Sequence, residues 1–402
     1  MNKEVVNVGR QEELDWAKSL AIVAMICVHV YEQLSIVDIE VVPTDAFRII
    51  LEFVAGPLTA PLFMFCMGVG IMYSNNSAPL QMVKRAFNLL RNGYLLSFFK
   101  GTILVAIALA LGYTINWTLA DSLFLVSILQ FAGMAFLTIA LMKKLRISLP
   151  VMLVISLALS VLGGQLSELD FSGSWLQYLF GLFFETNYVT TFPLFRWIFY
   201  PVFGMIFGYF LLRTTDKSRF YLRIFPIGIL GAVTFSIIYT ALGFDLRTMF
   251  MLSGRVYYSQ SLLHYLFTSL VIMAVLPVYY FLSVKIKIEP VNKAVSYLGE
   301  NLGSIYLAQW MIIPYVQAIL VLVGDVRIDV ALIIPVGILV LLGSIGIIEL
   351  IRLVKRRNSA HDFLENRKMF VKHDYYMRQI KSVSHGDGSF DSFPLTYDRQ
   401  VI

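Results

Sequence analysis

A hydrophobic segment near the amino terminus carries three ionisable side chains in one stripe. In a helix over residues 13–33, Lys18 and His29 are eleven residues apart, which leaves them roughly 20° apart around the helix axis. Asp15 lies about 40° from the same line, and about 16 Å of helix rise separates Lys18 from His29. Imidazole is the side chain best suited to remove a proton near neutral pH. We therefore predict His29 as a general base, with Lys18 and Asp15 at the amino-terminal end, or mouth, of the helix.

Ionisable groups inside an apolar segment are costly, which favours a function for this stripe. Insertion scales assign about 2.5–3.5 kcal/mol to a charged side chain at the centre of a membrane helix. In the alternative interpretation, Asp15 and Lys18 anchor the helix among lipid headgroups, where lysine can extend to the interface, and His29 is a neutral packing residue. The sequence leaves both interpretations open.

The composition is that of a polytopic membrane protein. The 402 residues are 58% hydrophobic and 14% charged, and the mean hydropathy is +0.74, which excludes an ordinary soluble globular protein. The two cysteines, Cys27 and Cys66, fall inside apolar segments and predict neither a disulfide framework nor a metal cluster. The net charge of +6 comes from basic residues in short loops and in the tail, so we expect no nucleic-acid partner.

Ten segments are long and apolar enough to span a bilayer, which takes about twenty residues. Their approximate ranges are 16–35, 47–73, 87–112, 120–142, 149–166, 189–212, 222–243, 259–282, 300–323 and 329–351. A shorter apolar run, 175–184, could be an eleventh, re-entrant or interfacial element. We read the first segment as retained, because His29 interrupts it and no small-residue cleavage site follows it.

Lysine and arginine alternate between the loops as the positive-inside rule requires. With the amino terminus inside, five basic residues fall on the outer side: Arg48, Arg196, Arg247, Arg255 and Arg327. We therefore predict an all-α polytopic membrane protein, a bundle of about ten transmembrane helices with both termini in the cytoplasm. Residues 1–351 form its transmembrane domain, and residues 352–402 form a polar, basic cytoplasmic tail that contacts membrane lipids.

The predicted outer connections combine acidic and aromatic residues. They are Asp38, Glu40, Asp45, Glu168, Asp170, Trp175, Tyr178, Phe183, Phe184, Glu185 and Tyr188. Such residues suit a polyhydroxylated acceptor, because hydroxyl groups need hydrogen bonds and sugar faces stack on rings. The alternative is an aromatic belt at the membrane interface.

The first segment resembles the start of the acyltransferase 3 family and of the wider transmembrane acyltransferase group that includes the heparan-α-glucosaminide N-acetyltransferases. Glu13, Asp15, a basic residue at Lys18 and His29 after ten intervening residues follow the pattern, with lysine in place of the more usual arginine. No histidine stands between His29 and His264, which favours the acyltransferase 3 pattern over the heparan branch.

Two weaker motifs extend this resemblance. Residues 60–68, followed by Lys84, Arg85 and Arg91, are similar to the second helix and cytosolic loop of the heparan-type branch. Residues 298–309 look like a late family helix that usually ends in histidine, and Gln309 stands at that position here. An acid or base role at Gln309 is therefore in doubt.

The resemblance implies acyl transfer from cytosolic acyl-CoA, with acetyl-CoA expected, to a carbohydrate or glycolipid acceptor outside the cytoplasm. His29 would act in it as a general base or as a transient acyl carrier. We expect Lys84, Arg85 and Arg91 to bind the donor's phosphates, or else to be only topology determinants. The acceptor-side or supporting candidates are His264, Arg255, Gln309 and Glu32. No metal is expected. The expected location is a bacterial cell (inner) membrane. The sequence does not decide whether the protein forms a homodimer.

Arg255 and His264 each keep an alternative. Arg255 is an acceptor or oxyanion contact, or else a surface charge, and His264 shares a cavity with His29, or else packs at the interface. A different class of protein, a transporter or flippase of a lipid-linked saccharide, could use the same buried charges. The sequence shows no inverted repeat and no pair of broken helices, which argues against transport.

Overall fold

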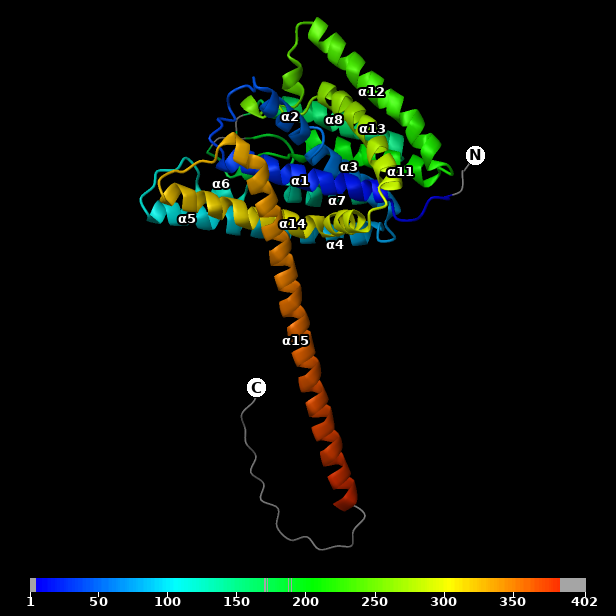
Figure 1. The fold of residues 1–402 in the computed structure, drawn as a ribbon, viewed down its shortest axis with the longest axis vertical. Coiled ribbons are helices and arrows are strands. Elements are labelled where there is room, and N and C mark those ends of the chain that lie inside the picture. Colours follow the sequence, from blue (N-terminus) through cyan, green and yellow to red (C-terminus); the bar gives the residue numbers. More distant parts are fainter. Residues whose placement is uncertain (1–4, 170, 172, 187, 189, 384–402) are drawn as a thin grey trace. The chain divides into compact units, whose positions relative to one another are not determined.

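The computed structural model describes the backbone of residues 5–383, except 170, 172, 187 and 189, and side chains up to residue 358. In the part of the chain it describes, the regular elements are helices, joined by two isolated β-bridges, Ser35–Ile328 and Val126–Thr190. The chain divides into two compact units, Met1–Ile345 and Gly346–Ile402. The helical elements, shown in Figure 1, agree with the predicted all-α class.

The longer helices follow the predicted segments. They are α1 (Glu12–Leu34), α2 (Ala46–Ala55), α3 (Ala60–Tyr73), α4 (Pro79–Ser97), α5 (Ile103–Ala110), α7 (Ile128–Lys144), α8 (Leu149–Leu166), α11 (Phe199–Leu212), α12 (Lys217–Ala241), α13 (Leu262–Lys285), α14 (Glu289–Leu322) and α15 (Ile333–Val383). A π-helix, Phe98–Thr102, joins α4 to α5, and the short helices are α6 (Leu119–Leu123), α9 (Leu176–Phe180) and α10 (Leu194–Trp197). Three 3₁₀ turns cover Leu246–Met249, Ser253–Arg255 and Val330–Leu332.

Nine helices of the described chain are long and apolar enough to cross a membrane. The remaining predicted segment, 120–142, is divided between α6 and α7. Ser127 ends the break between them, because its backbone N–H and its hydroxyl both donate to Gln130 Oε1 and cap a new helix. At about 1.5 Å per residue, the 17 residues of α7 measure about 25 Å, at the lower limit for a span.

α7 runs antiparallel to α4. Gln130 at its start packs against Gly93 near the end of α4, whereas Lys143 at its end donates to Ser77 O just before α4 begins, at 2.7 Å. α7 therefore returns the chain to the end of the bundle at which α4 starts. By contrast, the apolar run 175–184 forms only the five-residue α9, which is too short to span.

Glycine sets the closest helix contact, between α3 and α11. A Cβ on Gly68 would lie 1.9 Å from Pro201 O, and a Cβ on Gly204 would lie 2.0 Å from Phe65 O. The Gly204–Gly208 spacing predicts this kind of packing, and Gly204 and Gly208 do face α3. The two backbones meet because neither glycine carries a side chain.

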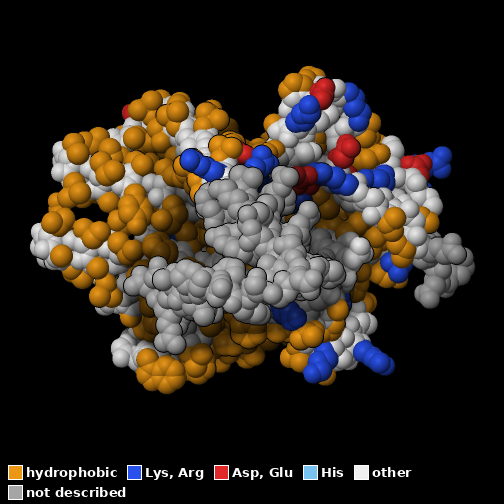
Figure 2. All heavy atoms as spheres, turned by 90° about the horizontal axis from the view of Figure 1, so that it is seen from below, with side chains coloured by type: hydrophobic (Ala, Val, Ile, Leu, Met, Phe, Trp, Pro, Cys, Tyr) orange, Lys and Arg blue, Asp and Glu red, His pale blue; other side chains and the backbone are white. Residues whose placement is uncertain are grey.

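The surface suits a lipid environment. In Figure 2, hydrophobic side chains cover most of the left half of the visible face, and many Lys and Arg side chains gather in the right half. Within α12, only Tyr221 and Gly228 are buried, and many apolar side chains, such as Leu230 and Ile237, are exposed. Such exposed apolar area is expected of helices that contact lipid rather than water.

Candidate functional site

A cavity of about 630 Å³ lies beside the second half of α1. α1 contributes residues from Met25 to Gln33, α14 contributes residues from Tyr306 to Gln317, and the π-helix contributes Lys100 and Gly101. The loop wall of the cavity comes from connections between helices, which contribute Ile39, Glu40, Tyr188, Thr191, Phe192, Leu252, Arg255, Tyr257 and Tyr258. A volume of this size accommodates a small substrate or the reacting end of a larger one.

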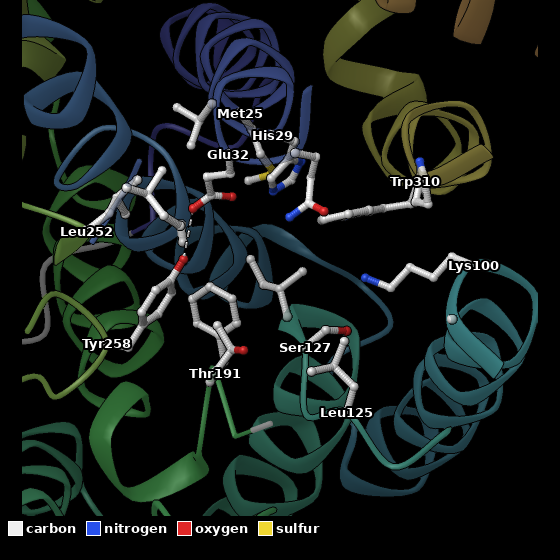
Figure 3. Close-up of a pocket in the computed structure, with 18 of the residues that line it drawn as sticks. Met25, His29, Glu32, Lys100, Leu125, Ser127, Thr191, Leu252, Tyr258 and Trp310 are labelled. Atoms are coloured by element: carbon white, nitrogen blue, oxygen red, sulfur yellow. Dashed lines mark hydrogen bonds between the residues drawn. The ribbon is translucent and has the colours of Figure 1, made fainter. Parts of the chain in front are cut away.

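His29 projects from α1 into this cavity, where its ring packs on Trp310 of α14 (Figure 3). The two ring centroids are 4.2 Å apart, with the planes tilted by 41°. Behind it, Gln309 is fully buried and close enough to interact with the imidazole. His29 Nδ1 and both amide atoms of Gln309 lack a hydrogen-bond partner in the described chain. Ring packing therefore holds the imidazole, and its Nδ1 atom is available for a further hydrogen bond.

Lys100 enters the same cavity from the π-helix. Its Nζ lies 3.6 Å from the centroid of the Trp310 ring, so Trp310 contacts both the ammonium group and His29. The neighbouring Gly101 allows a close helix contact, because a Cβ there would lie 3.3 Å from Ser122 O. π-helical turns often occur at functional sites, where they redirect a side chain.

Glu32 supplies a carboxylate to the cavity, one turn along α1 from His29. Tyr258 donates a hydrogen bond of 3.4 Å to Glu32 Oε1. A base, a cation and a carboxylate therefore line one space, together with the aromatic side chains of Trp310 and Tyr258 (Figure 3). This set can remove a proton from an acceptor and interact with a developing negative charge.

A buried network holds the loop wall of the cavity. Glu52, fully buried on α2, accepts hydrogen bonds from Tyr31 Oη at 2.6 Å and from the Leu252 backbone at 3.0 Å. Arg48 forms an ion pair with Glu52 at 3.4 Å and donates to the carbonyl of Val41 at 2.7 Å. These bonds join α1, α2 and two connections, which keeps Leu252 at the cavity.

A comparison with known protein families found a match for this chain. The sequence matches the family model of acyltransferase 3, described as an acyltransferase domain, over residues 11–349. The chain belongs to the acyltransferase 3 family. The match covers every residue named in the cavity above. No curated protein and no solved structure matches the chain. The more specific resemblance to the heparan branch stays a prediction.

Two predicted site residues of this acyltransferase lie at the mouth of α1 instead of in the cavity. Asp15 forms ion pairs with Arg10 at 2.6 Å and with Lys18 at 2.7 Å, and Arg10 also pairs with Glu300 at 2.6 Å. A Cβ on Gly299 would lie 3.1 Å from Asp15 Oδ1, so α14 packs directly on this group. The helical stripe is present, but a length of α1 separates its charged mouth from His29.

The predicted donor residues lie on α4. Lys84, Arg85 and Arg91 are exposed, and none of the three lines the cavity. Arg85 stacks over the ring of Phe136 on α7, with 4.7 Å between its guanidinium carbon and the ring centroid. Their role in binding donor phosphates stays a prediction.

The acceptor-side candidates divide into two groups. Glu32 and Arg255 line the cavity, whereas Gln309 does not line it but is buried within reach of His29. His264 does not line it, because its ring caps α13: Ser261 donates to Nδ1 at 2.8 Å, and Nε2 donates to Thr248 O at 3.1 Å. The histidine pair that the sequence suggested therefore does not share this cavity.

Sequence reasoning missed Lys100 and Trp310. Lys100 sits inside the predicted span 87–112, so the rule that singles out His29, an ionisable residue within an apolar segment, could have found it. Trp310 directly follows Gln309 but carries no charge to mark it. Among the described residues, no group of three or more His, Cys, Asp or Glu side chains could hold a metal ion.

Proposed function

We propose that this membrane acyltransferase moves an acyl group, an acetyl group in the simplest case, from cytosolic acyl-CoA to a hydroxyl or amine of an extracytoplasmic carbohydrate. The observation that carries the proposal is His29, which lines a cavity formed partly by Glu32, Trp310 and the outer connections. The aromatic and acidic side chains in those connections, such as Trp117, Tyr188 and Glu40, suit a polyhydroxylated acceptor.

His29 acts as the general base. Neutral imidazole accepts the proton of the acceptor as its oxygen or nitrogen attacks the thioester carbon, and later returns a proton to the departing thiolate. Trp310 fixes the ring, because the 4.2 Å stacking contact restricts its rotation. Lys18 and Asp15 hold the inner mouth of α1, and Lys84, Arg85 and Arg91 attract the polyanionic donor.

Thiol release from acetyl-CoA tests this proposal. We would measure it with purified protein in lipid nanodiscs, with and without a mixed pool of envelope saccharides. Release that depends on the acceptor is expected from the wild type, and His29→Ala should lower it by about 10²–10⁴-fold, the usual contribution of a general base. The matched control is His361→Ala, which lies outside the residues that match the family.

Two results would contradict the proposal. Full activity in a folded His29→Ala protein would remove His29 as the base and leave the acyltransferase class intact. If the wild type neither binds nor cleaves acetyl-CoA with any acceptor in the pool, the assignment of donor and acceptor fails.

A further inference from the structure

Lys100 is a buried lysine whose ammonium group faces the candidate cavity. Within the part of the chain that the structure describes, no carboxylate lies within ion-pair distance of Lys100, although the Glu32 carboxylate lines the same cavity, and the direct contact of Lys100 is the face of Trp310 at 3.6 Å. An aromatic face attracts a cation but leaves its N–H groups free to donate. The Lys100 ammonium can therefore still bind an anion.

The backbone around Lys100 holds this group in place. The π-helix Phe98–Thr102 widens the turn between α4 and α5, and Lys100 stands at its centre. Gly101 fits against α6, where a Cβ would approach Ser122 O to 3.3 Å. π-helical turns of this kind are frequent at functional sites.

Lys100 and His29 line the same cavity and lie near each other. Both lie against the same ring of Trp310, at 3.6 Å for Nζ and 4.2 Å for the imidazole centroid, so their separation cannot exceed the sum of these two distances. We propose that Lys100 binds the oxyanion that forms on the thioester carbonyl oxygen during acyl transfer. This inference rests on the function proposed above.

The step balances without any further reactant. The acceptor oxygen or nitrogen bonds to the thioester carbon, its proton passes to His29, and the carbonyl electron pair moves to oxygen, where Lys100 N–H donates a hydrogen bond. When the carbonyl re-forms, the carbon–sulfur bond breaks and the imidazolium of His29 returns the proton to the thiolate. Lys100 keeps its protons throughout and acts only by stabilising the negative charge.

Arg255, another cation that lines the cavity, already donates hydrogen bonds from two of its three guanidinium nitrogens. Its guanidinium donates to Tyr188 O and, at 2.7 Å, to Thr190 O, and it lies 3.9 Å from a Glu185 carboxylate oxygen. Through these contacts, Arg255 binds the connection that contributes Tyr188 to the loop wall of the cavity. The role predicted for Arg255 as an oxyanion contact therefore fits Lys100 better.

The kinetics of two Lys100 variants and one control variant test the inference. Lys100→Met removes the charge at similar volume, Lys100→Arg keeps the charge, and Lys293→Met is the control, since Lys293 pairs with Glu289 on the surface at 2.5 Å. In Lys100→Met, kcat for acetyl-CoA should fall by about 10²–10³-fold, as for loss of an oxyanion donor, with KM unchanged. Binding of S-ethyl-CoA, a thioether without the carbonyl oxygen, should be unchanged too.

A chemical rescue separates charge stabilisation from a structural role. Ethylammonium added to Lys100→Ala should restore part of kcat, because it can place an ammonium group in the space that the side chain leaves. Ethanol, of similar size and without charge, should not. If Lys100→Met fails to fold, Lys100→Arg and this rescue decide: no recovery of kcat in either overturns the inference.

The outcomes distinguish this inference from the proposed function. A wild type that cleaves acetyl-CoA while Lys100→Met keeps its full kcat overturns the role of Lys100 alone. Loss of S-ethyl-CoA binding in Lys100→Met also overturns it, because Lys100 would then bind the donor rather than the oxyanion. A wild type that neither binds S-ethyl-CoA nor cleaves acetyl-CoA overturns both.

Discussion

Gln309 stands where the resemblance to a late family helix predicts a histidine, and the structure buries it completely, within reach of His29. An amide cannot exchange a proton as imidazole does, but it can orient a neighbouring imidazole. Both of its polar atoms lack a partner in the described chain, and a buried polar group left unpaired costs about 1–3 kcal/mol. This position therefore gives up stability, as expected of a residue that serves the site.

Replacing Gln309 by methionine should raise stability and lower activity. Gln309→Met keeps the length of the side chain and removes the unpaired amide, so the thermal midpoint should stay the same or rise. Acyl transfer should fall by roughly 10- to 100-fold, because a displaced base reacts poorly even when it is still present. Unfolding and thiol release would be measured on the same preparation.

The exposed Gln165 on α8 provides the matched control, and Gln165→Met should change neither quantity. Full activity in Gln309→Met would show that His29 needs no polar neighbour. A large fall in the thermal midpoint would show that the amide stabilises the fold through contacts that the structure does not contain.

At the scale of single residues, the sequence was informative where an ionisable residue lies inside an apolar segment. His29 could be predicted because an ionisable group in an apolar helix is expensive. The partner ring of Trp310 could not, because an aromatic residue in a membrane helix is ordinary and only the packing of α14 on α1 brings it to 4.2 Å from His29. The mouth residues Asp15 and Lys18 share the stripe with His29, but the helix rise separates them from it.

Among the elements, α6 shows how a polar cap can interrupt an apolar segment. Asp121 accepts hydrogen bonds from Thr118 at 2.7 Å, from Tyr178 at 2.9 Å and from Tyr188 at 3.1 Å. Burial raises the pKa of this carboxyl, but these bonds outweigh burial and leave the pKa below its ordinary value. α6 lies outside the candidate membrane spans, and Tyr188 joins it to the wall of the cavity.

The Asp121 carboxylate should therefore stabilise the protein in a pH-dependent way. Its lowered pKa means that the stabilisation is complete above the ordinary carboxyl pKa of about 3.9 and is lost as the pH falls through the lower, folded-state value. Asp121→Asn should cost about 2 kcal/mol near pH 7, the range for hydrogen bonds to a charged group. The difference from the wild type should shrink at pH 3.

Thermal midpoints at the two pH values check this prediction. Asp325→Asn is the control, because Asp325 is exposed and forms only a surface ion pair with Arg327 at 3.1 Å. Such surface pairs contribute roughly 0–1 kcal/mol. A constant difference between Asp121→Asn and the wild type from pH 7 to pH 3 would contradict a role for the ionised carboxylate.

The contact between α3 and α11 gives a second prediction for the elements. Gly68→Ala should destabilise by about 3 kcal/mol, the upper end for overpacking, because its Cβ would meet backbone atoms of Pro201 that cannot move aside. Gly70→Ala, two residues along α3, should be neutral, since no atom lies within 4 Å of its Cβ. Thermal unfolding of both variants provides the comparison, and equal midpoints would refute the contact.

Hydropathy predicted which segments form helices better than where those helices begin and end. α14 begins at Glu289, eleven residues before the predicted span 300–323, because polar residues such as Lys293 can extend a helix beyond the apolar region. The division of 120–142 into α6 and α7 depends on hydrogen bonds from Thr118 and Ser127, which an average over apolar residues cannot register.

For the whole molecule, the number of crossings decides on which side each terminus lies. Nine crossings would leave the termini on opposite faces, whereas ten leave them on the same face. We expect ten, because α7 runs back along α4 to Ser77 and because the predicted outer connections are poor in lysine and arginine.

Epitope tags placed before residue 1, after residue 402 and at Gly243, in the connection after α12, would test the number of crossings in sealed vesicles of known orientation. Both terminal tags should be digested by protease from the cytoplasmic face, and the Gly243 tag from the other. Terminal tags on opposite faces would mean that α7 does not cross, and every connection after it would then exchange sides, including those that place Tyr188 and Arg255 on the acceptor side.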